Sequence, residues 1–291
     1  MLKAKTNVLM VLFDQPFPPD IRVEKEVTTL KKNYNIFLLA SRRKSEAHFE
    51  AYKGIYVLRM DWPFKKIRIL SYVVARVALL IKLILITSEY NVKLLHVHDL
   101  PYALPVIVFA KISRRKVVFD MHEPIGMYAH ESEIGRFREE AGVRTQLGRL
   151  WVFYMSLSEL LACKLATAVI VVVEENAERV IHLGIPKTKI VVVSNTADPE
   201  RLKRFEKKTP RKFLENKFIV SYIGGFGYHR GIDTLIRALP LIVKQKPHVH
   251  LLIVGGHSPT ERKDLENLSE QLGVREHVTF TGWVSFDKAM E

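Results

Sequence analysis

The stretch FIVSYIGGFGYHRGIDTLIRAL, residues 218–239, decides the fold prediction for this chain. Its apolar start is typical of a strand, and apolar residues at helical spacing from Ile232 onward indicate a helix. Between them a turn holds Arg230 and four glycines, Gly224, Gly225, Gly227 and Gly231. Glycines allow close approach of a ligand, and the free N–H groups and dipole of a helix N-terminus favour anions. The stretch predicts a phosphate site, with a tight turn that serves packing alone as the alternative.

The same alternation of strand and helix patterns runs along the whole chain. Strands are predicted at 8–13, 36–40, 55–60, 94–97, 117–120, 168–173, 190–193, 218–223, 250–254 and 277–280, and helices at 22–32, 69–87, 102–112, 146–165, 176–183, 232–244 and 259–272. This order is typical of an α/β fold with doubly wound, largely parallel sheets. The basic stretch RLKRFEKKTPRK suggests a linker. We therefore expect a first domain over residues 1–198, a linker over 199–216 and a second domain over 217–291.

Composition narrows the class of protein. The 291 residues carry a formal net charge of +14, which suits phosphorylated ligands, anionic lipid or nucleic acid, although Lys-, Arg- and Glu-rich surfaces also occur in thermophile proteins. The single cysteine, Cys163, excludes an intrachain disulfide. The apolar N-terminal stretch lacks a small-residue cleavage site and is interpreted as a strand. These features favour a cytoplasmic protein.

One segment requires a membrane test. Residues 69–87 are as long as a membrane span, but Arg76 and Lys82 near the middle offset the apolar residues. We favour a buried crossover helix. The preceding WPFKKIR, residues 62–68, mixes aromatic and basic residues and could dock peripherally on an anionic membrane surface, here the inner face of the membrane.

Polar residues gather where three predicted strands of the first domain end, the edge where α/β sheets bind ligands. They are Asp20 and Arg22, then His96, His98 and Asp99, then Asp120, His122 and Glu123. Because side chains alternate along a strand, His96 and His98 share a face, as do Asp120 and His122. A metal-dependent hydrolase using His96, His98, Asp120 and His122 is therefore one alternative. A nicotinamide enzyme is not expected, since residues 254–259, VGGHSP, lack the acidic ribose ligand.

The chain resembles the retaining GT-B glycosyltransferases of group 1, family four. The resemblance rests on ordered blocks that include FPPDIRVEKEVTTLKKN, HVHDLPYALP, VVFDMHEP, YIGGFGYHRGIDTLIRALPLI and HLLIVGG. It implies two Rossmann-like domains, the first holding mainly the acceptor and the second mainly a nucleoside diphosphate sugar. It also implies sugar transfer to an acceptor hydroxyl with retention of configuration. No metal or other cofactor is expected to be required, since no Asp-x-Asp lies near the phosphate turn. The acceptor is expected to be a lipid-linked, glycan or small molecule.

The resemblance also assigns roles to single residues. Arg230 and His122 match catalytic positions, and Asp20, Arg22, His98, Asp99 and Glu123 are assigned to acceptor binding. The donor is assigned to Gly224, Gly225, Gly227, Arg230, Val254, Gly255, Gly256, Trp283 and Val284. Three departures stand out: Gly225–Phe226 lacks the additional Arg usual after the first glycine, Pro18–Pro19 replaces paired glycines, and the Glu-x7-Glu motif should lie beyond residue 291. The second domain is thus expected to be incomplete and this chain poorly active.

A basic binding module for nucleic acid or membrane is the non-enzymatic alternative, suggested by the net charge of +14. Nucleic acid is not the expected partner. An anionic membrane surface remains a candidate partner.

Overall fold

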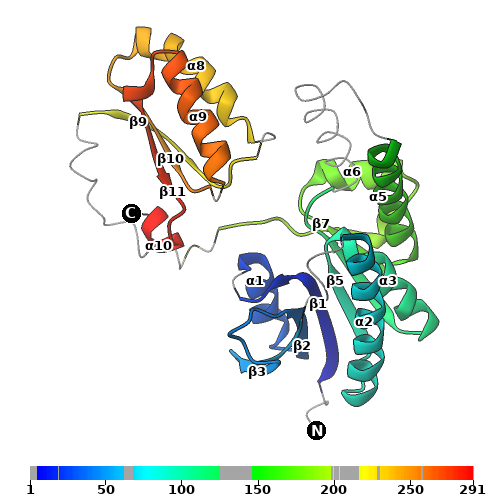
Figure 1. Cartoon of the computed structure of the whole chain (residues 1–291). Coiled ribbons are helices and arrows are strands. Elements are labelled where there is room, and N and C mark those ends of the chain that lie inside the picture. The colour runs from blue at the N-terminus through cyan, green and yellow to red at the C-terminus, as the bar shows by residue number, and fades with distance from the viewer. Residues whose placement is uncertain are drawn as a thin grey trace. The chain divides into compact units, whose positions relative to one another are not determined.

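The protein folds into two compact units, Met1–Asn195 and Thr196–Glu291. The computed structural model describes residues 5–18, 20–61, 68–124, 146–197, 199, 203, 216–227, 230–256 and 258–290. Most of the predicted linker, residues 199–216, therefore lies outside the described residues. Figure 1 shows the elements of each unit.

The first unit is built on an eight-stranded sheet in the order β3-β4-β2-β1-β5-β6-β7-β8. Every neighbouring pair is parallel except β3 and β4. The strands are β1 (Thr6–Pro16), β2 (Tyr34–Ser41), β3 (Phe49–Tyr52), β4 (Ile55–Met60), β5 (Leu94–His98), β6 (Lys116–Met121), β7 (Ala168–Val171) and β8 (Ile190–Val192). The helices are α1 (Ile21–Leu30), α2 (Arg68–Glu89), α3 (Leu100–Ile112), α5 (Gln146–Leu165) and α6 (Glu174–His182), with a short 3₁₀ turn at Lys187–Lys189.

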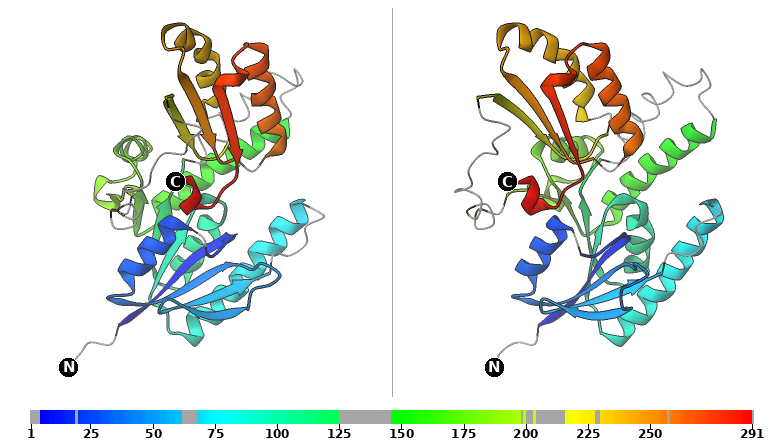
Figure 2. Two further views of the ribbon diagram at one scale, coloured as in Figure 1. Left: turned by 90° about the vertical axis from the view of Figure 1, so that its left-hand side faces the viewer. Right: turned by 60° about the vertical axis from the view of Figure 1, so that its left-hand side comes forward.

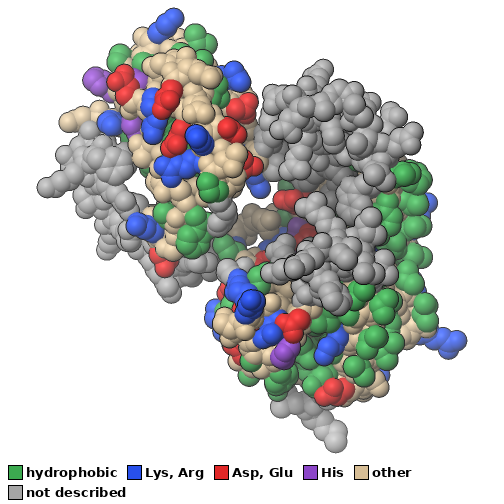
Figure 3. All heavy atoms as spheres, in the orientation of Figure 1, with side chains coloured by type: hydrophobic (Ala, Val, Ile, Leu, Met, Phe, Trp, Pro, Cys, Tyr) green, Lys and Arg blue, Asp and Glu red, His purple; other side chains and the backbone are tan. Residues whose placement is uncertain are grey.

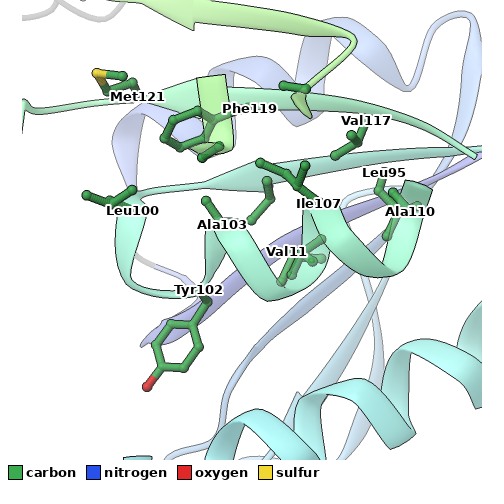
Figure 4. Packing of buried hydrophobic residues seen from close by; sticks show 14 of the residues in the cluster. Val11, Leu95, Leu100, Tyr102, Ala103, Ile107, Ala110, Val117, Phe119 and Met121 are labelled. Carbon is green, nitrogen blue, oxygen red and sulfur yellow. The ribbon is translucent and has the colours of Figure 1, made fainter. Parts of the chain in front are cut away.

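Alternation along the strands gives this sheet two cores. On one face, Leu9, Leu95 and Phe119 pack with residues of α2, α3, α5 and α6. Figure 4 shows α3 seated on β5 and β6 in this core. On the other face, Met10 and Leu12 pack against Val23 and Val27 of α1. Figures 1 and 2 show α1 and α2 on opposite sides of the sheet. The switch of helix side falls between β1 and β5, the position where such sheets bind ligands.

The edge strand β3 was not predicted. Lys53 and Gly54 both have positive φ, 47° and 83°, and Tyr52 pairs with Ile55 across them. Such a two-residue turn matches the right-handed twist of an antiparallel hairpin. The sequence predicts no helix between the strands at 36–40 and 55–60. In the structure these are the neighbouring strands β2 and β4, and the chain passes from one to the other through β3.

The second unit holds a three-stranded parallel sheet in the order β11-β10-β9. Its strands are β9 (Phe218–Ile223), β10 (Val249–Val254) and β11 (Val278–Gly282). The helices are α8 (Ile232–Gln245), α9 (Pro259–Gln271) and the short α10 (Phe286–Ala289), with a 3₁₀ turn at Arg275–His277. Ile236 and Leu239 of α8 pack on Leu251 and Ile253 of β10. The predicted α/β fold with parallel sheets is confirmed.

Helix α2 contains the segment that required the membrane test. Ala75, Leu79 and Leu83 line up on one face and are buried in the first core. Among the residues that the structure describes, no helix has the length and apolarity of a membrane span. The predicted docking segment before α2 lies outside the described residues up to Ile67.

Candidate functional site

Two strand ends and one helix bring a polar cluster together in the first unit. His96 and His98 lie on the face of β5 that looks toward α1, because Met10 of the α1 core pairs with His96 in register. His98 pairs with Asp120 on β6. The sequence-predicted His96, His98, Asp120 and His122 therefore meet, together with Arg22 from α1.

Asp120 is the centre of this cluster, and its side chain has 0% exposure. Arg22 donates from Nη2 to Asp120 Oδ1 at 2.8 Å and from Nε to Oδ2 at 3.4 Å. The same guanidinium donates from Nη1 to the Val193 carbonyl oxygen at 3.0 Å and to Asn195 Oδ1 at 2.9 Å. Arg22 was assigned to the acceptor, but its donors are engaged within the protein. A bidentate, buried pair of this kind fixes both side chains.

Three imidazoles surround the second oxygen of Asp120. Oδ2 lies 3.5 Å from His96 Nε2, 3.6 Å from His98 Nδ1 and 3.7 Å from His122 Nε2. His98 Nδ1 and His122 Nε2 share a hydrogen bond at 3.2 Å. His98 is completely buried, so it supports its neighbours and has no surface to offer an acceptor. The His122 side chain is 16% exposed, so it lies at the edge of the cluster.

Glu26 belongs to this cluster and was not predicted. Its Oε2 lies 3.9 Å from both His96 Nε2 and His98 Nε2. Burial, followed by the charge of Asp120, raises the pKa of Glu26 to about 9. Arg22 lies 3.0 Å from Glu26 and favours the ionised form, but Asp120 already neutralises that guanidinium, so burial prevails. Helical spacing could have indicated that Glu26 belongs to the cluster, because Glu26 lies one turn after Arg22 on the same helix.

The remaining ionisable groups divide into charged and neutral ones. Burial opposes ionisation of Asp120, yet hydrogen bonds from His122 and His96 hold its pKa well below the usual range. Burial, followed by the neighbouring His96, lowers the pKa of His98, so this ring is neutral. Burial would also lower the pKa of His122, but the hydrogen bond to Asp120 and the charge of Asp99 raise it above its ordinary value.

The cluster has the donor types of a metal site. Ligand atoms of Glu26, His96, His98 and Asp120 lie within 4.8 Å of one another. This set shares three members with the predicted metal ligands and replaces His122 by Glu26. Arg22 already provides a cation within 3.0 Å of a carboxylate oxygen of Glu26 and 2.8 Å of one of Asp120. Arg22 thus supplies positive charge at this place, although both carboxylate oxygens of Glu26 and the Nε2 atoms of His96 and His98 are buried without a hydrogen-bond partner among the described residues.

The other residues assigned to the acceptor lie around this cluster. Asp99 has φ 58° and ψ 151°, a strained backbone for a residue with a side chain, and its Oδ2 lies 3.4 Å from His122 Nδ1. Asp20 caps α1 by accepting from the Val23 N–H at 2.9 Å. Glu123 is exposed directly after His122. Asp99 and Glu123 thus flank His122, whereas the carboxylate of Asp20 is used in the helix cap.

The second unit holds the glycine-rich turn between β9 and α8. A Cβ at Gly255 would lie 2.3 Å from the Gly224 carbonyl oxygen, and Gly255 has φ 115°. The two loops that follow β9 and β10 therefore touch through backbone alone. A Cβ at Gly225 would meet nothing within 4 Å, so the backbone there is open to a ligand. Gly256, with φ 80°, lies against the ring of Phe226.

Among the described residues, no side chain caps the N-terminus of α8. Its N-cap is Gly231, with φ 66°, and the first backbone bond of the helix runs from Leu235 N to Gly231 O at 3.1 Å. The first-turn N–H groups are thus left for another acceptor. Arg230 is exposed, and within the described part of the chain no carboxylate pairs with its guanidinium. Positive charge and free donors coincide at this point.

The other residues assigned to the donor follow β10 and β11. The Gly255 N–H donates to the Gly282 carbonyl oxygen at 3.0 Å, which joins the carboxyl ends of these strands. Val254 is buried, and Gly255 and Gly256 are half-buried. Trp283 is exposed and Val284 half-buried, directly after β11. The assigned residues of this unit therefore lie on three neighbouring loops of one sheet edge.

Comparison with known proteins identifies the family. Residues 27–201 match Glycosyltransferase Family 4, and residues 203–291 match Glycosyl transferases group 1. The chain therefore belongs to the group 1, family four glycosyltransferases, as the resemblance predicted. The metal-dependent hydrolase is not favoured by these matches.

Individual relatives agree with this assignment. The uncharacterized glycosyltransferase MJ1607 of Methanocaldococcus jannaschii is 34% identical over 109 residues, which is 35% of this chain and 27% of the relative. Sucrose-phosphate synthase from Thermosynechococcus elongatus has a TM-score of 0.73 at 16% identity, covering 98% of this chain and 72% of that structure. Alr3699/HepE of Anabaena, in complex with UDP and glucose, has a TM-score of 0.61 at 16% identity, covering 96% and 69%. The fold is GT-B, as predicted.

Proposed function

We propose that this protein transfers a sugar from a nucleoside diphosphate sugar to an acceptor hydroxyl, with retention of configuration at the sugar. The observation that carries the proposal is the uncapped N-terminus of α8, which follows the exposed Arg230 and shares its loop with the open backbone at Gly225. A diphosphate supplies the negative charge that both features lack. The UDP bound in the Anabaena structure supports a nucleotide donor.

The chemistry follows from where charge develops. In the proposed step the bond between the anomeric carbon and the diphosphate oxygen breaks, and the acceptor oxygen bonds to that carbon from the same side. The acceptor proton passes to the departing diphosphate. Arg230 and the α8 N–H groups stabilise the growing negative charge, which is the main contribution of the protein. His122 donates a hydrogen bond to the transferring sugar.

On the acceptor side we divide the assigned residues by their contacts. Asp99 and Glu123 are the candidates for direct contact, because they flank the partly exposed His122. Arg22, His98 and Asp20 act through other residues, since their polar atoms are engaged in the cluster or in the α1 cap. The acceptor is a hydroxyl of a glycan, lipid-linked or small molecule.

A thermal-shift panel tests the donor. UDP-, GDP- and ADP-sugars are compared with uridine, guanosine and adenosine, because a ligand that binds the native state alone raises Tm. We expect a concentration-dependent increase with at least one sugar nucleotide and none with its nucleoside. Equal shifts from both would mean that the diphosphate is not recognised. For the donor that binds, the anomeric configuration of the transfer product, read by NMR, tests retention.

A further inference from the structure

A band of exposed apolar side chains crosses three helices of the first unit. On α2 it contains Val77, Ile81, Ile84 and Leu85, spaced so that they share one side of the helix. On α3 and α5 it continues through further exposed residues, namely Val108, Ile112, Leu150, Phe153, Tyr154, Leu157 and Leu161. Ile112 is 79% exposed and Phe153 66%. We call this set the apolar helix face.

The apolar helix face is continuous. α3 contacts both α2 and α5. Arg76 of α2 donates from Nη2 to the Tyr154 hydroxyl of α5 at 3.2 Å, so these two helices also meet directly. Figure 3 shows hydrophobic side chains gathered along this side of the first unit. The opposite sides of the same helices are buried in the first core.

The exposed charges on the helices of the apolar helix face are mostly positive. Lys82, Lys111 and Lys164 are exposed on the three helices. Within these helices Glu89 is the only exposed acidic residue that the structure describes. The other acid, Glu159, is buried and lies 2.6 Å from Arg179 Nη1. Exposed apolar side chains next to lysines match a binding partner whose interior is apolar and whose surface is anionic.

We propose that the apolar helix face docks on an anionic bilayer surface. Monomeric proteins rarely expose apolar patches of this extent without a partner. Helices lying in the interface plane bury apolar side chains at the acyl boundary, while lysines contact anionic headgroups. A second copy of the chain is a poorer match, because a two-fold contact would bring like-charged lysines together. The inference is independent of the donor site, since every residue it uses lies in the first unit.

Co-sedimentation of the full chain with vesicles tests this surface. Vesicles of neutral phosphatidylcholine are compared with vesicles that contain about one third phosphatidylglycerol. The test variant is Ile81→Glu with Phe153→Glu. The matched control is Phe49→Glu with Leu241→Glu, which replaces two apolar residues of 51% and 66% exposure outside the apolar helix face. Each variant adds two negative charges, so the net charge of the protein changes equally in both. Circular dichroism confirms that each variant folds.

We expect the wild type and the control to bind the anionic vesicles at least tenfold more tightly than the neutral ones. The Ile81/Phe153 variant should lose at least tenfold in affinity for the anionic vesicles. Absence of wild-type binding, or an equal loss in both variants, would overturn the proposal. So would a wild-type dimer in sedimentation velocity that dissociates only in the Ile81/Phe153 variant, because the face would then be covered by a second copy.

Discussion

Arg22 holds Asp120 by two nitrogen atoms, with Nη2 2.8 Å from Oδ1 and Nε 3.4 Å from Oδ2, and it spans from α1 to the end of β6. The same side chain binds the Val193 carbonyl oxygen and Asn195, which lie just after β8. One guanidinium thus joins a helix and two strand ends of the first unit, and places Asp120 among three histidines.

Arg22→Ala should lower the free energy of unfolding of the first unit by about 3–5 kcal/mol, because it leaves a buried carboxylate without its partner. The control is Arg42→Ala, which removes a pair of 2.7 Å with the exposed Asp61. That surface pair should contribute at most about 1 kcal/mol. Urea denaturation measures both values, and similar losses in the two variants would show that the Arg22 pair is not desolvated.

Glu26→Gln should stabilise the protein increasingly as the pH rises. Burial raises the pKa of Glu26 to about 9 from an ordinary 4.5, so the folded state keeps a proton that the unfolded chain releases. The stability that this carboxyl contributes is therefore fully present below pH 4.5 and is lost as the pH rises toward 9. Glutamine stays neutral throughout and removes this loss.

The measurement for Glu26 is urea denaturation at several pH values. The difference between Glu26→Gln and wild type should grow by up to about 1.4 kcal/mol per pH unit between the two pKa values. Glu24→Gln, on the same helix but in a surface pair with Lys53, is the control and should show little pH dependence. A constant difference for Glu26→Gln would mean that its carboxyl is ionised in the folded protein.

Gly255→Ala should disrupt the turn of the second unit more than Gly273→Ala does. Both glycines have positive φ, 115° and 68°, so both variants strain the backbone. Only at Gly255 would the added Cβ also collide with a neighbour, the Gly224 carbonyl oxygen at 2.3 Å. We expect a larger fall in Tm for Gly255→Ala, together with loss of nucleotide binding, and retention of binding in Gly273→Ala. Equal Tm values would show that the two loops separate at little cost.

His122→Ala should lower kcat by about a hundredfold, the effect of removing a donor that serves the transition state, while leaving the Kd for the donor nucleotide nearly unchanged. His182→Ala on α6 is the control, since that ring bonds its own helix at the Glu178 carbonyl oxygen, 2.8 Å away. Steady-state kinetics and calorimetry separate the two effects. If kcat and nucleotide affinity fall together, His122 supports the structure of the site.

Much of the first-unit cluster could be predicted because it depends on local periodicity. Alternation along β5 places His96 and His98 on one face, and parallel strand ends bring them to Asp120. The contact of Arg22 with Asn195 joins residues 173 positions apart, and no local pattern indicates it. The strained φ of Asp99 likewise depends on the turn between β5 and α3, since its N–H is held by the Asp120 carbonyl oxygen at 3.1 Å.

Two features were missed although the sequence carried a signal for them. The Lys53–Gly54 pair between apolar residues is a hairpin signal, and it forms the turn between β3 and β4. Glu26 lies one helical turn after Arg22 and shares the inward side of α1 with Val23 and Val27. Its burial was not apparent because a lone glutamate on a helix is usually exposed.

The central claim is that the N-terminus of α8 and Arg230 bind the diphosphate of the donor. Calorimetry with the nucleoside diphosphate of the donor that binds tests it most directly, on the wild type, Arg230→Ala and Arg237→Ala. Arg237 is an exposed arginine further along the same helix and controls for net charge. We predict that Arg230→Ala raises Kd about ten- to a hundredfold, as loss of a charge-assisted hydrogen bond does, and that Arg237→Ala leaves Kd nearly unchanged. Equal Kd values for the wild type and Arg230→Ala would contradict the account.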